Sequence, residues 1–335
     1  MSDAVNNSPF FIVGCGRSGT TLLRSILASH SRLSIPPETW FLNKMVDLME
    51  LRRPLSEQEV GRAVDVITNH YRWPDFELDA NDFRAEVFAL RNPHFKDVVE
   101  VLYRKHMVRE GKSRWGDKTP GYIELVPQIT EVFNGAQFIH LMRDGRDVAK
   151  SFQSQRWNGK WLPDNGREWI SAMNWAERWQ RSEYAERILA VRYEDLVLDT
   201  KTTIQRICGF LNEAFEPQML DWRVGADGIV PQREMKIHTK LAKAPDVSDL
   251  YRWKREMSAR EVFVCEALMR KHLRSGGYEL RYYSVVWLPL LAIAKLFCAT
   301  ILPIFKALAR AVRFVGRTVS RSGQMSSAKG KTVGS

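Results

Sequence analysis

Short apolar runs alternate with amphipathic stretches along most of this chain. Buried strands are predicted for the short apolar runs, at residues 10–13, 33–35, 138–142 and 188–192. Helices are predicted from apolar periodicity and capping signals, at about residues 20–27, 40–110, 148–154, 167–187 and 200–211. Because strands alternate with helices, we expect an α/β fold of three α/β/α layers with a central, mostly parallel sheet and helical insertions.

Composition narrows the class of protein. Of the 335 residues, 44% are hydrophobic and 27% charged, which excludes a disordered or collagen-like chain and a polytopic membrane protein. The net charge is +11, but eight of the positive charges lie from residue 283 onward, where no acidic residue occurs, so the body carries only +3. We therefore predict no nucleic-acid partner for the globular part.

The cysteines and the N-terminus indicate a cytoplasmic protein. Four cysteines lie scattered without metal-ligand spacing, which predicts no zinc site and no disulfide framework, at Cys15, Cys208, Cys265 and Cys298. The first nine residues are polar and show no signal-peptide pattern. Both observations are typical of a reducing compartment.

A glycine-rich loop follows the first predicted strand and leads into a helix. Gly14, Gly16 and Gly19 match the dinucleotide fingerprint G-x-G-x-x-G, and Glu38 follows at the distance of the acidic ribose ligand. The loop also nearly matches a Walker A motif, except that Thr20 replaces the lysine that holds the phosphates in nucleotide triphosphatases. Every interpretation places backbone N–H groups at a helix N-terminus, which is an anion site. The residues predicted to form this P-loop-like site are Arg17, Ser18, Gly19, Thr20 and Thr21.

A second candidate anion site follows the strand predicted at residues 138–142. Arg143 comes directly after this strand, and Ser151 lies two helical turns further along. The carboxyl ends of parallel strands meet at one edge of a sheet. Two anion sites at that edge indicate a ligand with two separated anionic ends, whereas an ordinary charged turn is the alternative for residues 143–146.

Together these motifs resemble the sulfotransferases that use 3′-phosphoadenosine 5′-phosphosulfate (PAPS). Residues 17–21 look like the 5′-phosphosulfate loop of that family, and Arg143 with Ser151 looks like its 3′-phosphate site. The spacing is more similar to the tyrosylprotein-sulfotransferase branch and its bacterial relatives than to the cytosolic small-molecule branch. The resemblance covers roughly residues 10–275. It implies PAPS as sulfuryl donor, 3′-phosphoadenosine 5′-phosphate (PAP) as product, and no metal.

The resemblance also implies roles for single residues. Glu38 stands where the tyrosylprotein branch has its glutamate and would be the general base, although a helix cap is the alternative. Lys118, in a lysine–proline turn, would stabilise charge on the bridging and sulfonate oxygens, although a solvated lysine is the alternative. Arg17 would neutralise the departing 5′-phosphate. Further nucleotide contacts are implied for Tyr193, Arg252 and Lys254.

Some positions depart from the family pattern. A second arginine of the 3′-phosphate site would fall on Gln155, with Arg156 one residue late, and Thr239 is the nearest counterpart of an expected serine. Histidine is the base in related enzymes. This makes His30 and His140 alternative bases, although a structural role is favoured for both.

The C-terminal region has its own character. Residues 285–305 contain seventeen apolar residues in twenty-one, but Lys295 lies at the centre and Pro289 and Pro303 are expected to interrupt a helix. Basic residues repeat on one face of residues 295–317, so an amphipathic helix on an anionic membrane surface is favoured over a dimerisation or core helix and over a true span. The predicted organisation is a sulfotransferase domain at 1–282, a membrane-association segment at 283–318 and a disordered tail at 319–335.

The predicted function is therefore sulfuryl transfer from PAPS to a hydroxyl or amine, by a cytoplasmic enzyme peripheral on the inner face of a membrane. The membrane segment favours a lipid, glycolipid or glycan acceptor. A P-loop kinase or NTPase and a non-catalytic nucleotide-binding membrane protein are the alternatives. Whether the chain forms a homodimer is left open by the sequence.

Overall fold

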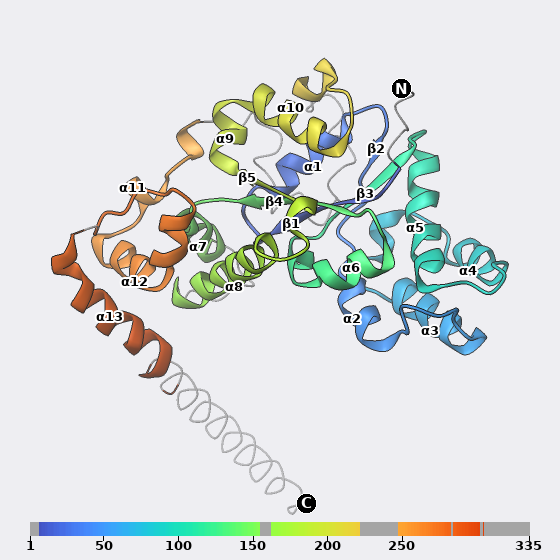
Figure 1. The fold of residues 1–335 in the computed structure, drawn as a ribbon, viewed down its shortest axis with the longest axis horizontal. Coiled ribbons are helices and arrows are strands. Elements are labelled where there is room, and N and C mark those ends of the chain that lie inside the picture. The colour runs from blue at the N-terminus through green and yellow to red at the C-terminus, as the bar shows by residue number, and fades with distance from the viewer. Residues whose placement is uncertain (1–6, 155–161, 222–246, 283, 302–303, 305–335) are drawn as a thin grey trace, which may run out of the picture. The chain divides into compact units, whose positions relative to one another are not determined.

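The computed structural model describes residues 7–154, 162–221, 247–282, 284–301 and 304 (Figure 1). The chain divides into two compact units, Met1–Met257 and Ser258–Ser335, and each is described by itself. The domain boundaries expected at residues 282 and 318 stay predictions.

The first unit contains a five-stranded sheet in which every strand pair is parallel. In sheet order the strands are β2 (Leu33–Ser34), β3 (Arg114–Lys118), β1 (Phe10–Gly14), β4 (Gln137–Met142) and β5 (Ile188–Arg192). The predicted parallel α/β fold is confirmed. The turn expected around Lys118 is wrong in one respect, since residues 114–118 form a buried strand. Its sequence, RWGDK, has too many polar residues for an apolar run to reveal it.

Helices cover both faces of this sheet (Figure 1). The α-helices of the first unit are α1 (Thr20–Ala28), α2 (Phe41–Leu48), α3 (Glu57–Thr68), α4 (Ala80–Phe88), α5 (Phe95–Arg109), α6 (Val126–Val132), α7 (Gly145–Gln153), α8 (Leu162–Gln180), α9 (Tyr193–Leu198), α10 (Thr200–Leu211) and α11 (Trp253–Glu256). Short 3₁₀ helices occupy Trp73–Phe76, Pro120–Leu125, Ala185–Arg187, Pro217–Asp221 and Val247–Asp249.

Alternating residues of β1 bury themselves in two separate cores. Phe10 and Ile12 join the cluster formed with α1, α9 and α10. Phe11 faces the other way and stacks on Phe138 of β4, with ring centroids 5.5 Å apart. Both faces of the strand are therefore apolar, as in parallel sheets that carry helices on each side.

A helical insertion separates β2 from β3. It comprises α2 to α5 (Figure 1), and the predicted capping box at the start of α3 is confirmed, because Ser56 and Glu59 bond reciprocally. Leu33 of β2 pairs with Arg114 of β3, so the insertion leaves and rejoins the sheet on adjacent strands.

Arg114 anchors the amino-terminal edge of the sheet, away from the predicted site. Its guanidinium is buried and bonds to Glu213 at 3.0 Å and to the carbonyls of Ser8 and Leu211 at 2.8 and 2.6 Å. We expect Arg114→Met to lower the free energy of unfolding by about 3–5 kcal/mol, because it leaves the buried carboxylate of Glu213 with fewer partners. Urea unfolding would measure the loss, and a variant as stable as the parent would contradict it.

The second unit is described through Ile301 and at residue 304. It contains α12 (Ala259–Ser275), a 3₁₀ turn at Val285–Trp287, α13 (Leu288–Leu296) and a π-helical turn at Phe297–Ile301. Pro289 was expected to interrupt a helix, which is wrong. It lies in the first turn of α13, where its missing N–H has no helical partner to lose. Pro303 lies outside the described residues.

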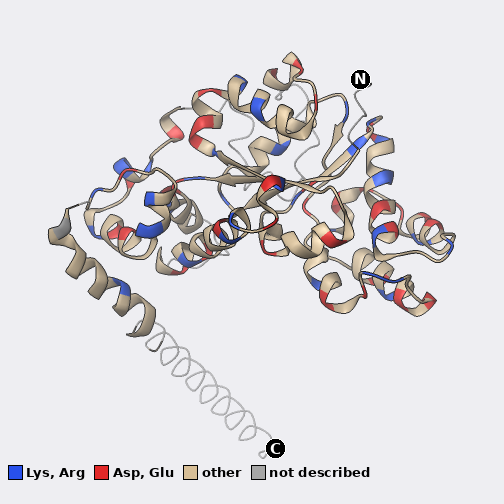
Figure 2. Ribbon diagram, in the orientation of Figure 1, with Lys and Arg blue, Asp and Glu red and all other residues tan. Residues whose placement is uncertain are grey.

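The surface of α13 is unusually apolar. Leu290, Ile293 and Leu296 are 50%, 64% and 63% exposed. Figure 2 shows α13 almost without charge, apart from one basic band. Among the described residues no helix combines the length and hydropathy that crossing a bilayer requires.

Candidate active site

Each of the five parallel strands leads into one predicted site group at its carboxyl end. The glycine loop follows β1, Glu38 comes four residues after β2, and Lys118 is the last residue of β3. Arg143 and Tyr193 directly follow β4 and β5. The sheet therefore collects residues up to 176 positions apart along one edge.

The glycine loop turns sharply into α1. Gly19 has φ 93° and begins the helix without a side-chain cap, which leaves the N-terminus of α1 suited to an anion. A Cβ atom on Gly19 would come within 2.3 Å of the Tyr193 ring. Arg17 also has a left-handed conformation, with φ 68°, which is uncommon for a residue that carries a side chain.

The two predicted anion sites share an edge. Arg17 donates from Nε to the Ser151 hydroxyl at 3.2 Å. Arg143 lies over the ring of Tyr193, 4.4 Å from its centroid, and the same ring touches Gly19. Arg17, Ser151, Arg143 and Tyr193 therefore form one continuous surface.

Buried polar atoms at this surface fit an anionic ligand. Among the described residues the Ser18 hydroxyl and Nε of Arg143 have no hydrogen-bond partner, although both are buried. A buried donor without a partner is costly. Phosphate oxygens at these positions would satisfy both.

Glu38 and Lys118 form an ion pair beside the loop. Lys118 is buried, bonds to Oε1 of Glu38, and lies 3.3 Å from the Thr21 hydroxyl. Oε2 of Glu38 accepts from Arg72 at 3.1 Å and from Nε1 of Trp40 at 2.7 Å. Glu38 is therefore no helix cap, and Lys118 is no solvated lysine.

The protonation of Glu38 follows from these partners. Burial alone raises its pKa, but the charges of Lys118 and Arg72 and the hydrogen bonds of Lys118 and Trp40 outweigh burial and lower the pKa to about 2. Glu38 is consequently a carboxylate at neutral pH. Its low pKa makes it a weak proton acceptor while both cations are in place.

A buried network fixes the backbone of this pair. The amide of Thr39 donates to the hydroxyl oxygen of Thr119 at 3.0 Å, and the Thr39 hydroxyl donates to Asp117 at 2.9 Å. Tyr103 donates to the same carboxylate at 2.8 Å. Burial raises the pKa of Asp117 to about 6. Thr39 and Thr119, which follow Glu38 and Lys118 in the sequence, are thus bonded to each other.

The segment at residues 251–254, which contains Arg252 and Lys254, lies against α7 through its tryptophan. Trp253 donates its amide to Asp147 at 2.8 Å, and the guanidinium of Arg146 lies 3.6 Å from its ring centroid. Arg252 pairs with Glu256 at 2.7 Å. Lys254 lies 5.4 Å from the Tyr251 ring centroid. Arg252 also lies close enough to Asp147 of α7 to act on its carboxylate.

Arg143 connects this segment to the loops. Its NH2 donates to the carbonyl of Asp249 at 2.9 Å and lies 3.4 Å from Asp147. Sequence reasoning found Arg143 but missed Asp147 and Trp253 as the residues that hold the segment.

The remaining candidates are structural or lie outside the described residues. His140 is buried in β4, and burial lowers its pKa to about 4. His30 bonds to the carbonyl of Ala214 at 2.9 Å, at the amino-terminal side of β2. Gln155, Arg156 and Thr239 lie outside the described residues.

Sheet topology decides between the interpretations of the glycine loop. In a dinucleotide-binding fold β2 adjoins β1, whereas here β3 lies between them. The loop has no lysine of its own, and Lys118 brings a cation to it from β3. Among the described residues no group of three His, Cys, Asp or Glu side chains could hold a metal.

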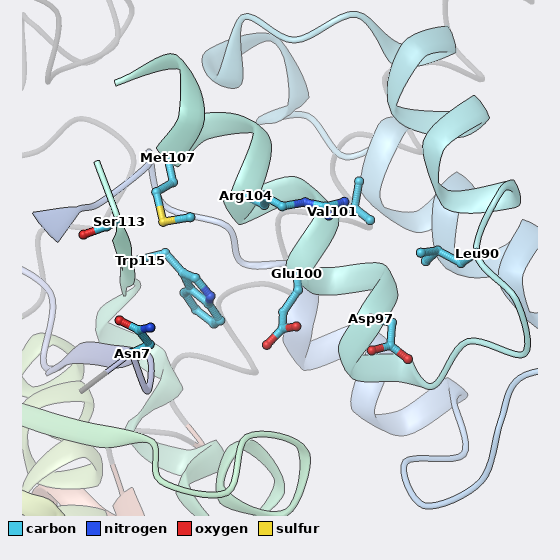
Figure 3. Close-up of a pocket in the computed structure, with 9 residues that line it drawn as sticks. All are labelled: Asn7, Leu90, Asp97, Glu100, Val101, Arg104, Met107, Ser113 and Trp115. Carbon is cyan, nitrogen blue, oxygen red and sulfur yellow. The ribbon is translucent and has the colours of Figure 1, made fainter. Parts of the chain in front are cut away.

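A cavity elsewhere does not coincide with this site. It measures about 290 Å³ and is lined by residues that include Asn7, Ser113, Trp115 and Glu100 (Figure 3). Asn7 and Ser113 precede β1 and β3, which places the cavity at the amino-terminal edge of the sheet. The groups predicted to bind anions lie at the opposite edge.

Comparison with known proteins agrees with this arrangement. A family model described as the sulfotransferase family matches residues 9–217. The chain belongs to the sulfotransferase family. The sulfotransferase domain of the Synechococcus PCC 7002 olefin synthase has the same fold, with a TM-score of 0.57, 24% identity, and coverage of 82% of this chain and 98% of that one.

Relatives in the sulfotransferase family include longer proteins. An uncharacterized protein of Aquifex aeolicus is 28% identical over 64% of this chain and 26% of its own length. Protein-tyrosine sulfotransferase 1 of Danio rerio is 24% identical over 72% of this chain and 64% of its own length. The chain thus spans less than two thirds of either relative.

Proposed function

We propose that this sulfotransferase transfers the sulfuryl group of PAPS to a hydroxyl or amine of an acceptor. The observation that carries the proposal is the shared edge of the two anion sites, where Arg17 reaches Ser151 and Arg143 stacks on Tyr193. A nucleotide with separate 5′ and 3′ anionic groups fits two such sites, whereas ATP has no 3′-phosphate.

The chain's own residues supply charge and orientation for this reaction. The amides at the start of α1, with Arg17, Ser18 and Thr20, would hold the 5′-phosphate and stabilise it as it departs. Arg143 and Ser151 would hold the 3′-phosphate, with Arg252 and Lys254 as further candidate contacts. Lys118 and Thr21 would lie against the sulfonate and the bridging oxygen.

Glu38 is the proposed general base. As the acceptor oxygen bonds to sulfur and the bond from sulfur to the 5′-phosphate oxygen breaks, Glu38 would take the acceptor proton. In this proposal Lys118 moves from Glu38 to the donor, and its departure removes the charge that lowers the Glu38 pKa most. Donor binding would thus prepare the base.

Nucleotide binding separates this proposal from its competitors. We expect isothermal titration to show PAP binding and no comparable ATP binding. Tight ATP binding without PAP binding would favour a P-loop kinase or NTPase. Release or transfer of radiolabelled sulfate from PAPS distinguishes an enzyme from a non-catalytic nucleotide-binding protein.

The exposed face of α13 supports a peripheral position on the inner face of a membrane. Apolar side chains at 290, 293 and 296 can enter the acyl boundary, and the many basic residues beyond 304 in the sequence complement anionic lipid. A cytoplasmic enzyme held there would meet a lipid, glycolipid or membrane-bound glycan. We propose that acceptor class for this chain.

We expect the full chain to float with phosphatidylserine vesicles at low salt. The double variant Ile293→Glu/Leu296→Glu should abolish flotation, because carboxylates on the face proposed to enter the bilayer oppose insertion. Val108→Glu is the matched control, since Val108 is 68% exposed on the first unit. Unchanged flotation of the double variant would contradict the proposal.

A further inference from the structure

The two oxygens of Glu38 have different surroundings. Oε2 accepts two hydrogen bonds, from Arg72 at 3.1 Å and from Trp40 at 2.7 Å. Oε1 bonds to Lys118, whose ammonium also lies 3.3 Å from Thr21 at the start of α1. Oε1 therefore lies on the donor side, and Oε2 lies toward the helical insertion.

Arg72 is well placed to hold a carboxylate still. Its side chain is 10% exposed, and its other terminal nitrogen lies 3.6 Å from a carboxylate oxygen of Asp75. The ring of Trp40 lies against Gly121, where a Cβ would approach to 2.8 Å. Both donors to Oε2 are thus fixed by contacts of their own.

We propose that Arg72 and Trp40 are positioning residues that anchor Oε2 of Glu38, and that Oε1 is the oxygen that accepts the acceptor's proton. The inference rests on the proposed function, in which Lys118 moves from Glu38 to the donor. Once Lys118 has moved, Oε1 is released toward the donor and Arg72 is the cation that still balances the charge of Glu38. Without Arg72, separating Lys118 from Glu38 would leave the carboxylate poorly neutralised.

A double-mutant cycle on donor affinity tests this directly and needs no acceptor. We would measure the binding of radiolabelled PAPS at 4 °C to the full chain and to the variants Arg72→Gln, Glu38→Gln and their combination. Arg72→Gln should weaken PAPS binding about tenfold, because the variant lacks the charge-assisted hydrogen bond that stabilises the Glu38 carboxylate once Lys118 has moved to the donor. In the Glu38→Gln background the same change should alter affinity by less than about twofold, since no carboxylate remains to be balanced.

Conservative variants separate positioning from folding. Arg72→Lys keeps the charge and should lose less affinity than Arg72→Gln. Trp40→Phe keeps the ring but removes the Nε1 donor and should weaken binding only when Glu38 is present. If Arg72→Gln fails to fold, as judged by thermal melting, Arg72→Lys and Trp40→Phe replace it in the double-mutant cycle with Glu38→Gln.

The matched control is Arg53→Gln. Arg53 makes a comparable two-point pair with Glu59, at 3.0 and 2.8 Å, in the same insertion but on its exposed surface. Arg53→Gln should leave PAPS affinity unchanged.

Two outcomes would overturn the inference, and a third would overturn its premise. An equal loss on Arg72→Gln with and without Glu38 would show a structural role only, and no loss in either background would show no role. A parent chain that binds neither PAP nor PAPS would instead refute the proposed function.

Discussion

Replacing Glu38 by Gln should lower the rate of sulfuryl transfer about 10²–10⁴-fold, the usual contribution of a general base. Glutamine keeps the size of the side chain and can still face Arg72, but it cannot take the acceptor's proton. Radiolabelled transfer from PAPS measures the rate.

The same variant should retain nucleotide binding, because the residues proposed to face the two phosphates are untouched. PAP affinity within about threefold of the parent would show that the loss lies in the chemical step. Turnover near the parent level would remove Glu38 as the base and leave the two histidines to be tested, although His140 is buried and its pKa is lowered to about 4.

Gly19→Ala should abolish measurable PAP binding. An alanine at φ 93° costs about 1–2 kcal/mol, and its Cβ would meet the Tyr193 ring at 2.3 Å, which adds about 1–3 kcal/mol of overpacking. Relieving the contact moves either the loop or Tyr193, and both belong to the proposed nucleotide site. Isothermal titration with PAP measures the effect.

Gly209→Ala is the control for that experiment. Gly209 lies inside α10, and an added Cβ would have no neighbour within 4 Å. Alanine there should raise the free energy of unfolding by about 0.5–1 kcal/mol and leave PAP binding unchanged. Intact PAP binding by Gly19→Ala would show that the loop tolerates displacement and does not hold the 5′-phosphate as proposed.

The sequence made it possible to predict that the glycine loop and Arg143 lie close together. The loop and Arg143 lie next to strands of mainly apolar residues, which periodicity reveals, and the parallel sheet then brings their ends together. That Arg17 and Ser151 would be in contact follows from this topology, since the loop and α7 begin at adjacent strands.

The rest of the candidate site was harder to foresee. β3 contains Arg, Trp, Gly, Asp and Lys, and its burial depends on tertiary partners such as Glu213 and Tyr103. Arg72 lies 34 residues from Glu38, on a helical insertion whose path no local pattern specifies. Trp253 lies between Arg252 and Lys254, which the sequence singled out, but its contact with Arg146 depends on the tertiary fold.

The helical insertion between β2 and β3 has a consequence for engineering. Trp40 and Arg72 lie on it, whereas Arg17, Arg143 and Tyr193 lie outside it. Its two ends are neighbours, because Leu33 pairs with Arg114. A chimera that exchanges this stretch with that of a relative would need junctions at only two adjacent points. Such a chimera could accept a new acceptor, while the residues proposed to bind the nucleotide stay unchanged.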